Sequence, residues 1–203
     1  MGPTLHAQNA PFPWYMPDEG APHERTWMAF GASRKIWGKR LLPGVRENLA
    51  LIANTISEFE PVSMLARPEE MDLARKAVGK KVTLIPCPLD DLWMRDTGPL
   101  FVLDRKGNKA AVNCNFNGWG EKQEHRQDSK VASFIAGQAG VSEIETGLVL
   151  EGGCVELDGE GTAIVTESCV LNPNRNPEFT KAKFEEELGS VLGLQKIIWL
   201  PGI

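Results

Sequence analysis

Residues 89–99 read LDDLWMRDTGP, and this stretch says more about the fold and the function than any other part of the chain. It places Trp93, Arg95 and Asp96 close together, just before an apolar run that we expect to form a strand. A second acidic sequence, LEGG at 150–153, follows at the end of another apolar run. Two carboxylates, Asp96 and Glu151, are therefore expected where strands end. Buried acids are rare without a partner, so this arrangement suggests a cationic substrate.

The composition is typical of a globular protein with one substantial core, since 42% of the 203 residues are hydrophobic and 24% are charged. The formal net charge is -5 and no dense run of lysine or arginine occurs, so nucleic acid is not an expected partner. No apolar run approaches the roughly 20 residues needed to cross a bilayer, so no membrane association is expected. We therefore expect a cytoplasmic protein that binds a small molecule.

We expect residues 1–15 to form a flexible leader and residues 16–203 to form one domain. The leader contains Leu5-His6-Ala7-Gln8, which resembles the end of a signal peptide, and export is therefore the alternative to a cytoplasmic location. The apolar core that such a peptide requires is missing from this segment.

Neither the cysteines nor the histidines form a recognisable motif. The cysteines are far apart in sequence and have no CxxC spacing, which argues against a zinc site and against a redox pair and favours buried free thiols. The histidines have no obvious partner. The residues concerned are Cys87, Cys114, Cys154 and Cys169, and His6, His23 and His125.

The first half of the sequence predicts alternating strands and helices. A buried strand is expected from Thr26, with the sequence TWMAF, and apolar residues at helical spacing predict a helix over 45–59. Short apolar strands are expected at 62–65 and 82–85. Between them a helix begins at Pro68, where proline suits the first turn and the following glutamates suit the helix dipole.

The second half predicts a repeated unit of hairpin, helix and strand. Strands at 100–103 and 110–116 flank the turn 104–108, and a helix near 129–139 and a strand near 148–150 follow. The same order recurs with a turn at 158–161, a helix after Asn176-Pro177 and a strand at 197–200. Such a repeat is typical of a fold built from similar modules around an axis. Strand ends of successive modules would then converge, and Asp96 and Glu151 lie at module boundaries.

Each candidate site residue has a structural alternative. Asp96 either caps a turn with Thr97 or binds a guanidinium group through paired, charge-assisted hydrogen bonds. Glu151, followed by two glycines that permit close backbone approach, either caps a turn or belongs to the site. Trp93 is either core or a wall for a flat cation. We expect Arg95 to form a salt bridge within the scaffold.

The segment FNGWG at 116–120 is the third candidate feature, because it follows a hairpin strand and carries Asn117 and Trp119. It is either a pocket wall or an aromatic turn lined by glycines. The two interpretations stay open from the residues alone.

Five segments together resemble the agmatine deiminase and bacterial-type peptidylarginine deiminase family. They are MPDEGAPHERTWMAF (16–30), DDLWMRDTGPLFV (90–102), FNGWGEK (116–122), LEGGCVELDGEGT (150–162) and ESCVLNPNRNP (167–177). The resemblance spans nearly the whole chain from Met16. It implies a pentein-type α/β propeller with pseudo-fivefold repeats, here incomplete, with residues 16–203 as about the first half of a single catalytic domain.

The resemblance also implies a reaction, in which a cysteine thiolate attacks a guanidinium carbon, a histidine transfers protons, ammonia leaves and water releases a ureido product. Agmatine as substrate would place the reaction in putrescine biosynthesis. No metal or organic cofactor is implied. The implied roles are guanidinium binding for Asp96, a place in the catalytic set for Glu151, and substrate contact for Trp93, Trp119 and Asn117.

The family that the chain resembles uses a nucleophilic cysteine and a general-base histidine, and neither has a counterpart in this chain. The GHxD-type motif of the family follows a WLPG strand, and the present sequence stops at Trp199–Ile203. The resemblance places Cys154 in a hairpin strand, and it is not expected to be the nucleophile. We therefore expect the chain alone to be inactive, with the missing C-terminal half possible as a second chain and a homo-oligomer also possible.

Three functions stay open at this point. Agmatine is favoured over peptidyl-arginine because FNGWG contains no arginine that could bind a carboxylate. A catalytically dead half that binds guanidinium groups is the third alternative.

Overall fold

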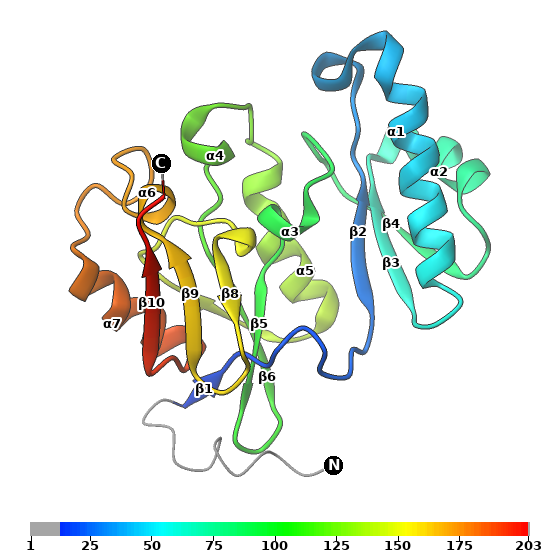
Figure 1. Ribbon diagram of the computed structural model, residues 1–203. Coiled ribbons are helices and arrows are strands. Elements are labelled where there is room, and N and C mark those ends of the chain that lie inside the picture. Colours follow the sequence, from blue (N-terminus) through cyan, green and yellow to red (C-terminus); the bar gives the residue numbers. More distant parts are fainter. Residues whose placement is uncertain (1–12, 203) are drawn as a thin grey trace. The chain divides into compact units, whose positions relative to one another are not determined.

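The computed structural model describes residues 13–202, which fold into two compact α/β units (Figure 1). The first unit contains the chain up to Ala21, Arg95–His125 and the chain from Ser129 on, and the second contains Pro22–Met94 and Arg126–Asp128. None of the helices within 13–202 is long and apolar enough to span a membrane. The leader expected at 1–15 lies mostly outside the described residues. Its last two residues form strand β1 (Trp14–Tyr15) and pair with Asp104 and Leu103.

The second unit is a three-stranded parallel sheet with helical connections, as the alternating pattern predicts. Its strands are β2 (Thr26–Phe30), β3 (Val62–Ala66) and β4 (Val82–Pro86), in the order β2-β3-β4. Helix α1 (Arg34–Ile56) connects β2 to β3. A 3-10 turn, η1 (Pro68–Glu70), and helix α2 (Met71–Ala77) connect β3 to β4. Every residue of the central strand β3 is buried, which is why its sequence is a short run without alternation.

Helix α1 differs from the helix expected at 45–59. It begins at Arg34, is interrupted by Gly38 at φ 66°, and ends at Ile56. The apolar spacing continues to Phe59, but the backbone closes a turn there, and the Phe59 side chain is 86% exposed. The N–H groups of both Phe59 and Glu60 donate to the carbonyl of Ile56. The apolar periodicity therefore predicted a helix that continues beyond its observed end at Ile56.

The first unit contains the repeated module. Strands β5 (Leu100–Asp104) and β6 (Lys109–Asn113) form an antiparallel hairpin, and β7 (Ser142–Glu145) pairs parallel to β6. Strands β8 (Val155–Leu157) and β9 (Thr162–Thr166) form the next hairpin, and β10 (Lys196–Leu200) pairs parallel to β9. Figure 1 shows the two modules in green and in yellow to red. The predicted order of hairpin, helix and strand is confirmed in both.

The helices of this unit are short, apart from two connections. Helix α5 (Val131–Ala139), preceded by the 3-10 turn η2 (Asp128–Lys130), leads from β6 to β7. Helix α7 (Lys181–Leu192) leads to β10, begins after the capping residue Thr180 and ends at Gly193 with φ 74°. Single turns occupy the remaining positions: α3 (Met94–Thr97), α4 (Gly118–Glu121), η3 (Gly152–Cys154) and α6 (Glu167–Val170).

The strand expected at 148–150 is wrong, since the strand of this module is β7 at Ser142–Glu145. Leu148 and Leu150 are buried, and the N–H of Leu150 donates to the backbone carbonyl of Cys114 at 3.0 Å, but side chains bind the rest of this backbone in place of a neighbouring strand. The amide of Asn176 accepts from the N–H of Val149 at 2.9 Å and donates to its carbonyl at 2.8 Å, and Asn115 donates to the Leu148 carbonyl. The apolar run therefore predicted burial correctly, but it predicted strand pairing incorrectly.

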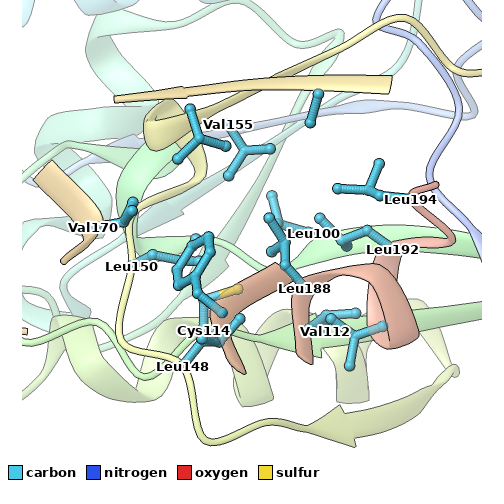
Figure 2. Packing of buried hydrophobic residues seen from close by; sticks show 14 of the residues in the cluster. Leu100, Val112, Cys114, Leu148, Leu150, Val155, Val170, Leu188, Leu192 and Leu194 are labelled. Atoms are coloured by element: carbon cyan, nitrogen blue, oxygen red, sulfur yellow. The ribbon is translucent and has the colours of Figure 1, made fainter. Parts of the chain in front are cut away.

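The hydrophobic core of the first unit holds the chain next to the candidate site residue Glu151. Leu148 and Leu150, with 0% and 1% exposure, belong to the same buried cluster as Leu188 and Leu192 of α7 (Figure 2). Burying one leucine side chain stabilises a fold by about 1.5–3 kcal/mol. The chain at Leu150 is therefore firmly held, and Glu151 follows directly from it at the edge of this core.

Candidate active site

Asp96 lies in the single turn α3, directly before β5. Its carboxylate accepts a hydrogen bond from the side chain of Trp119 and another from the backbone N–H of Gly153. Neighbouring Arg95 forms ion pairs with Glu19 and, at 3.7 Å, with Glu156. The expected role of Arg95 in the scaffold is therefore confirmed, and the carboxylate next to it is held by residues from two other segments.

The two glycines after Glu151 allow those segments to approach each other. A Cβ atom on Gly152 would lie 2.4 Å from the carbonyl oxygen of Arg95, and one on Gly153 would lie 3.3 Å from Oδ1 of Asp96. The first of these separations is too short for any side chain. Close backbone approach, the reason expected for the glycine pair, is what the structure contains.

Glu151 is buried, with 3% exposure, and its partner is an arginine of the same chain. Nε of Arg175 lies 3.0 Å from Oε1 and 3.2 Å from Oε2, and Nη2 lies 2.9 Å from Oε1. The thiol of Cys154 donates to Oε2 at 2.9 Å. A planar guanidinium fork suits a carboxylate, and this pair satisfies a charge that would be costly to bury alone.

Arg175 is held by the asparagine-rich loop 172–176. Its Nη1 donates to Oδ1 of Asn174 at 3.0 Å, and the carbonyl of Asn174 accepts from Nδ2 of Asn117 at 2.9 Å. Buried Asn176 fixes the end of the loop against Val149 and Val170. Sequence reasoning did not include this loop among the site residues. A lone arginine within NPNRNP, in a chain with a buried acid in need of a cation, was the available signal.

Trp119 belongs to a turn with left-handed backbone. Gly118, Trp119, Gly120 and Glu121 have φ values of 68°, 58°, 80° and 63°. Two of them are not glycine, and the left-handed helical conformation costs such residues roughly 1–2 kcal/mol each. The side chain of Asn117 accepts from the N–H of Gly120 at 2.8 Å and stabilises the turn. Strained turns of this kind are concentrated at functional sites.

The left-handed turn aims the Trp119 indole, whose ring centroid lies 4.9 Å from that of Phe116 in an edge-to-face contact. Four of the predicted site residues thus belong to one network in the first unit: Asp96, Glu151, Asn117 and Trp119.

Trp93 belongs to the second unit, where its contacts are different ones. Its indole N–H donates to Oδ2 of Asp91 at 3.0 Å, and its ring centroid lies 6.1 Å from that of Trp37. Trp37 donates to the other oxygen of Asp91 at 2.8 Å. Asp128 accepts from the backbone N–H groups of Asp90 and Asp91 and holds this segment in place.

The electrostatics of Asp96 indicate negative charge that its surroundings do not fully compensate. The pKa of Asp96 is raised, first by burial and then by the nearby charge of Glu151. The hydrogen bonds from Trp119 and Gly153 and the charge of Arg95 lower this pKa by less. Because a bound cation would favour the ionised carboxylate, the position suits a cationic group.

The cysteines fall into two classes. Cys87 and Cys114 are buried thiols, and burial raises their pKa values to about 11 and about 12. Cys154 and Cys169 are half-buried, and their sulfur atoms lie 3.1 Å apart. The sequence spacing gave no sign of this contact, because the β8–β9 hairpin and turn α6 bring together two residues that are distant in sequence.

The chain is similar to known agmatine deiminases in sequence and in fold. The agmatine deiminase of Stutzerimonas stutzeri is 39% identical over 195 residues, which cover 93% of this chain and 53% of that protein. The structure of the agmatine deiminase of Enterococcus faecalis matches with a TM-score of 0.88 and 31% identity, over 96% of this chain and 54% of that one. A substrate-bound agmatine deiminase structure from C. jejuni matches with a TM-score of 0.82 and 26% identity, over 92% of this chain and 56% of that one.

These matches confirm the expected fold class, since the mixed α/β fold is that of the pentein-type agmatine deiminases. The chain spans about half the length of the curated relatives it matches. The model of the Porphyromonas-type peptidyl-arginine deiminase family matches residues 15–203. The chain therefore belongs to the Porphyromonas-type peptidyl-arginine deiminase family.

Proposed function

We propose that this chain is part of a deiminase that converts the guanidinium group of agmatine into a ureido group and releases ammonia. The observation that carries the proposal is the Asp96 carboxylate, which two hydrogen bonds hold in place while burial and Glu151 raise its pKa. A guanidinium group would supply the positive charge and the paired N–H donors that suit this carboxylate. The agmatine deiminases among the relatives support the same substrate class.

Asp96 binds the guanidinium group in this proposal, and Glu151 belongs to the catalytic set. Glu151 acts beside Asp96 through its negative charge, which Arg175 holds in one orientation. Trp119 and Asn117 contribute to the wall of the substrate site in this proposal. Fixing a planar cation in one orientation removes much of the entropic barrier to attack on its carbon.

The reaction needs a nucleophile and a proton carrier besides these residues. A cysteine thiolate attacks the guanidinium carbon, a histidine protonates the departing ammonia, and water then releases the ureido product from the thiouronium intermediate. We assign both groups to the part of the protein outside these 203 residues, in the same polypeptide or in a second chain. A cytoplasmic location belongs to the same proposal.

Ammonia release from agmatine by the full-length protein tests the function. Asp96→Asn keeps the shape and removes the charge, and losing about 3 kcal/mol of charge-assisted binding would lower kcat/KM by about 100-fold. Asp104→Asn is the matched control, because Asp104 is an aspartate of the exposed β5–β6 turn and should leave kcat/KM unchanged. Full activity of Asp96→Asn would contradict the proposal.

Peptidyl-arginine is the second candidate substrate, and the description of the matching family model favours it. The same assay with a peptide that contains arginine separates the two, since the preferred substrate has the higher kcat/KM. The 203-residue chain alone should form no product. If the full-length protein binds agmatine in an Asp96-dependent way without turnover, the catalytically dead alternative holds.

A further inference from the structure

Cys154 and Cys169 are placed as a thiol pair. Their sulfur atoms lie 3.1 Å apart, and both cysteines are free and half-buried. Cys154 ends the turn η3 before β8, and Cys169 lies in the turn α6 after β9, so the antiparallel hairpin fixes their distance. A disulfide bond is about 2.05 Å long, so the sulfur atoms need to approach by only about 1 Å.

The surroundings favour a thiolate at Cys169. A hydrogen bond from Cys154 and the charge of Arg175 lower the pKa of Cys169 to about 7, against burial and the charges of Glu151 and Asp96. The pKa of Cys154 is raised, by its hydrogen bond with Cys169, by burial and by Glu151. One thiol of the pair therefore ionises near neutral pH while the other retains its proton. The thiolate is the form that reacts with disulfides.

A metal ion is the competing use of these groups, because potential ligand atoms of Glu151, Cys154 and Cys169 lie within 4.8 Å of one another. Arg175 argues against it. Its guanidinium already contacts both oxygens of Glu151, and its positive charge would repel a divalent cation at the same place. The same charge stabilises a thiolate, so the arrangement favours thiol chemistry.

We propose that Cys154 and Cys169 form a reversible intramolecular disulfide when the protein meets a small-molecule disulfide such as glutathione disulfide. The Cys169 thiolate attacks one sulfur of glutathione disulfide, and one glutathione thiolate leaves. Cys154 then gives up its proton and attacks the Cys169 sulfur, and the second glutathione leaves. Two protein thiols are oxidised, and one glutathione disulfide is reduced to two glutathione molecules.

Oxidation changes the candidate site directly. In the reduced protein the single proton of the Cys154 thiol is shared between Oε2 of Glu151, at 2.9 Å, and the sulfur of Cys169, at 3.1 Å, and a disulfide has no proton to donate. The thiolate that faces Arg175 is lost at the same time. The inference itself concerns only the bond between the two sulfur atoms, and it stands whether or not the protein is a deiminase.

The test is to incubate the reduced protein with glutathione disulfide, alkylate the remaining thiols and map the cysteines by mass spectrometry without reduction. Two of the four cysteines should lose their thiols, in a cross-linked peptide that contains Cys154 and Cys169 and that dithiothreitol reverses. Cys154→Ser should stop at a glutathione adduct on Cys169. Cys114→Ser is the matched control and should keep the cross-link.

Three results would overturn the inference. They are survival of all four thiols, a stable glutathione adduct on Cys169 in the unaltered protein, and a cross-link through Cys87 or Cys114. The mapping of the unaltered protein decides the question even if a variant fails to fold. A parallel sample of reduced protein with Zn²⁺ tests the alternative, and one-to-one binding that blocks alkylation of both thiols would favour the metal.

Discussion

Replacement of Arg175 by methionine should destabilise the fold far more than the loss of an ordinary salt bridge. Arg175 and Glu151 have side chains only 8% and 4% exposed, and the guanidinium contacts both carboxylate oxygens. Arg175→Met keeps much of the side-chain length but leaves the buried charge of Glu151 without its cation. Breaking a buried pair in this way costs about 3–5 kcal/mol.

Urea unfolding followed by tryptophan fluorescence measures this loss. With a denaturant slope of about 2 kcal/mol per molar urea, the unfolding midpoint should fall by roughly 1.5–2.5 M. Lys81→Met is the matched control, because Lys81 and Glu58 are also an ion pair, at 2.7 Å, with side chains 62% and 61% exposed. Its loss should stay below about 1 kcal/mol.

The variant Arg175→Met with Glu151→Gln completes the comparison. Removing both charges should recover part of the stability that Arg175→Met loses, because the cost arises from the unpaired carboxylate. Equal losses for Arg175→Met and Lys81→Met would refute the reasoning, since Glu151 would then be stable without its arginine.

Two further stability predictions concern a glycine and a buried acid. Gly152→Ala should destabilise the fold by more than about 2 kcal/mol, because its Cβ would lie 2.4 Å from the Arg95 carbonyl oxygen. Gly137→Ala in α5 is the control: its Cβ would meet nothing within 4 Å, and the variant should be more stable by about 0.5–1 kcal/mol. Chemical denaturation of both variants measures the two changes. Burial raises the pKa of Asp128 to about 6, above its unfolded value of about 3.9, so the folded state holds the proton more tightly. The contribution of Asp128 should therefore be fully present below about pH 4 and decline by roughly 3 kcal/mol as the pH rises through 6. Urea titrations at several pH values should show this decline, and Asp128→Asn should lack it; an unchanged slope in the variant would assign the pH dependence to other groups.

The sequence predicted a strand correctly where a buried segment also pairs with neighbouring strands. Strand β3 is buried throughout and paired on both sides, so its apolar run predicted it correctly. The segment 148–150 is also apolar, and Leu148 and Leu150 are buried, but Asn115 and Asn176 bind its backbone from distant positions. Periodicity reports which residues avoid water, and it does not report which group accepts each backbone hydrogen bond.

The sequence likewise predicted only part of the candidate site. Asp96 and Glu151 were visible in the sequence because each is an acid next to an apolar run. Arg175 was not, because its contact with Glu151 spans 24 residues and depends on the folded loop. The pair of Cys154 and Cys169 spans 15 residues and depends on a hairpin. Contacts that form only through tertiary packing have no characteristic spacing in the sequence, so a motif cannot predict them.

The two carboxylates look equivalent in the sequence, but their surroundings in the structure differ. Glu151 already binds a guanidinium group, that of Arg175, through N–O distances of 2.9, 3.0 and 3.2 Å. A guanidinium ligand at Glu151 would have to displace Arg175 and leave a buried cation unpaired, which is costly. The pKa of Asp96 is raised, first by burial and then by the charge of Glu151, so a bound cation would stabilise its ionised form. We therefore propose Asp96, and not Glu151, as the carboxylate that would contact a guanidinium ligand.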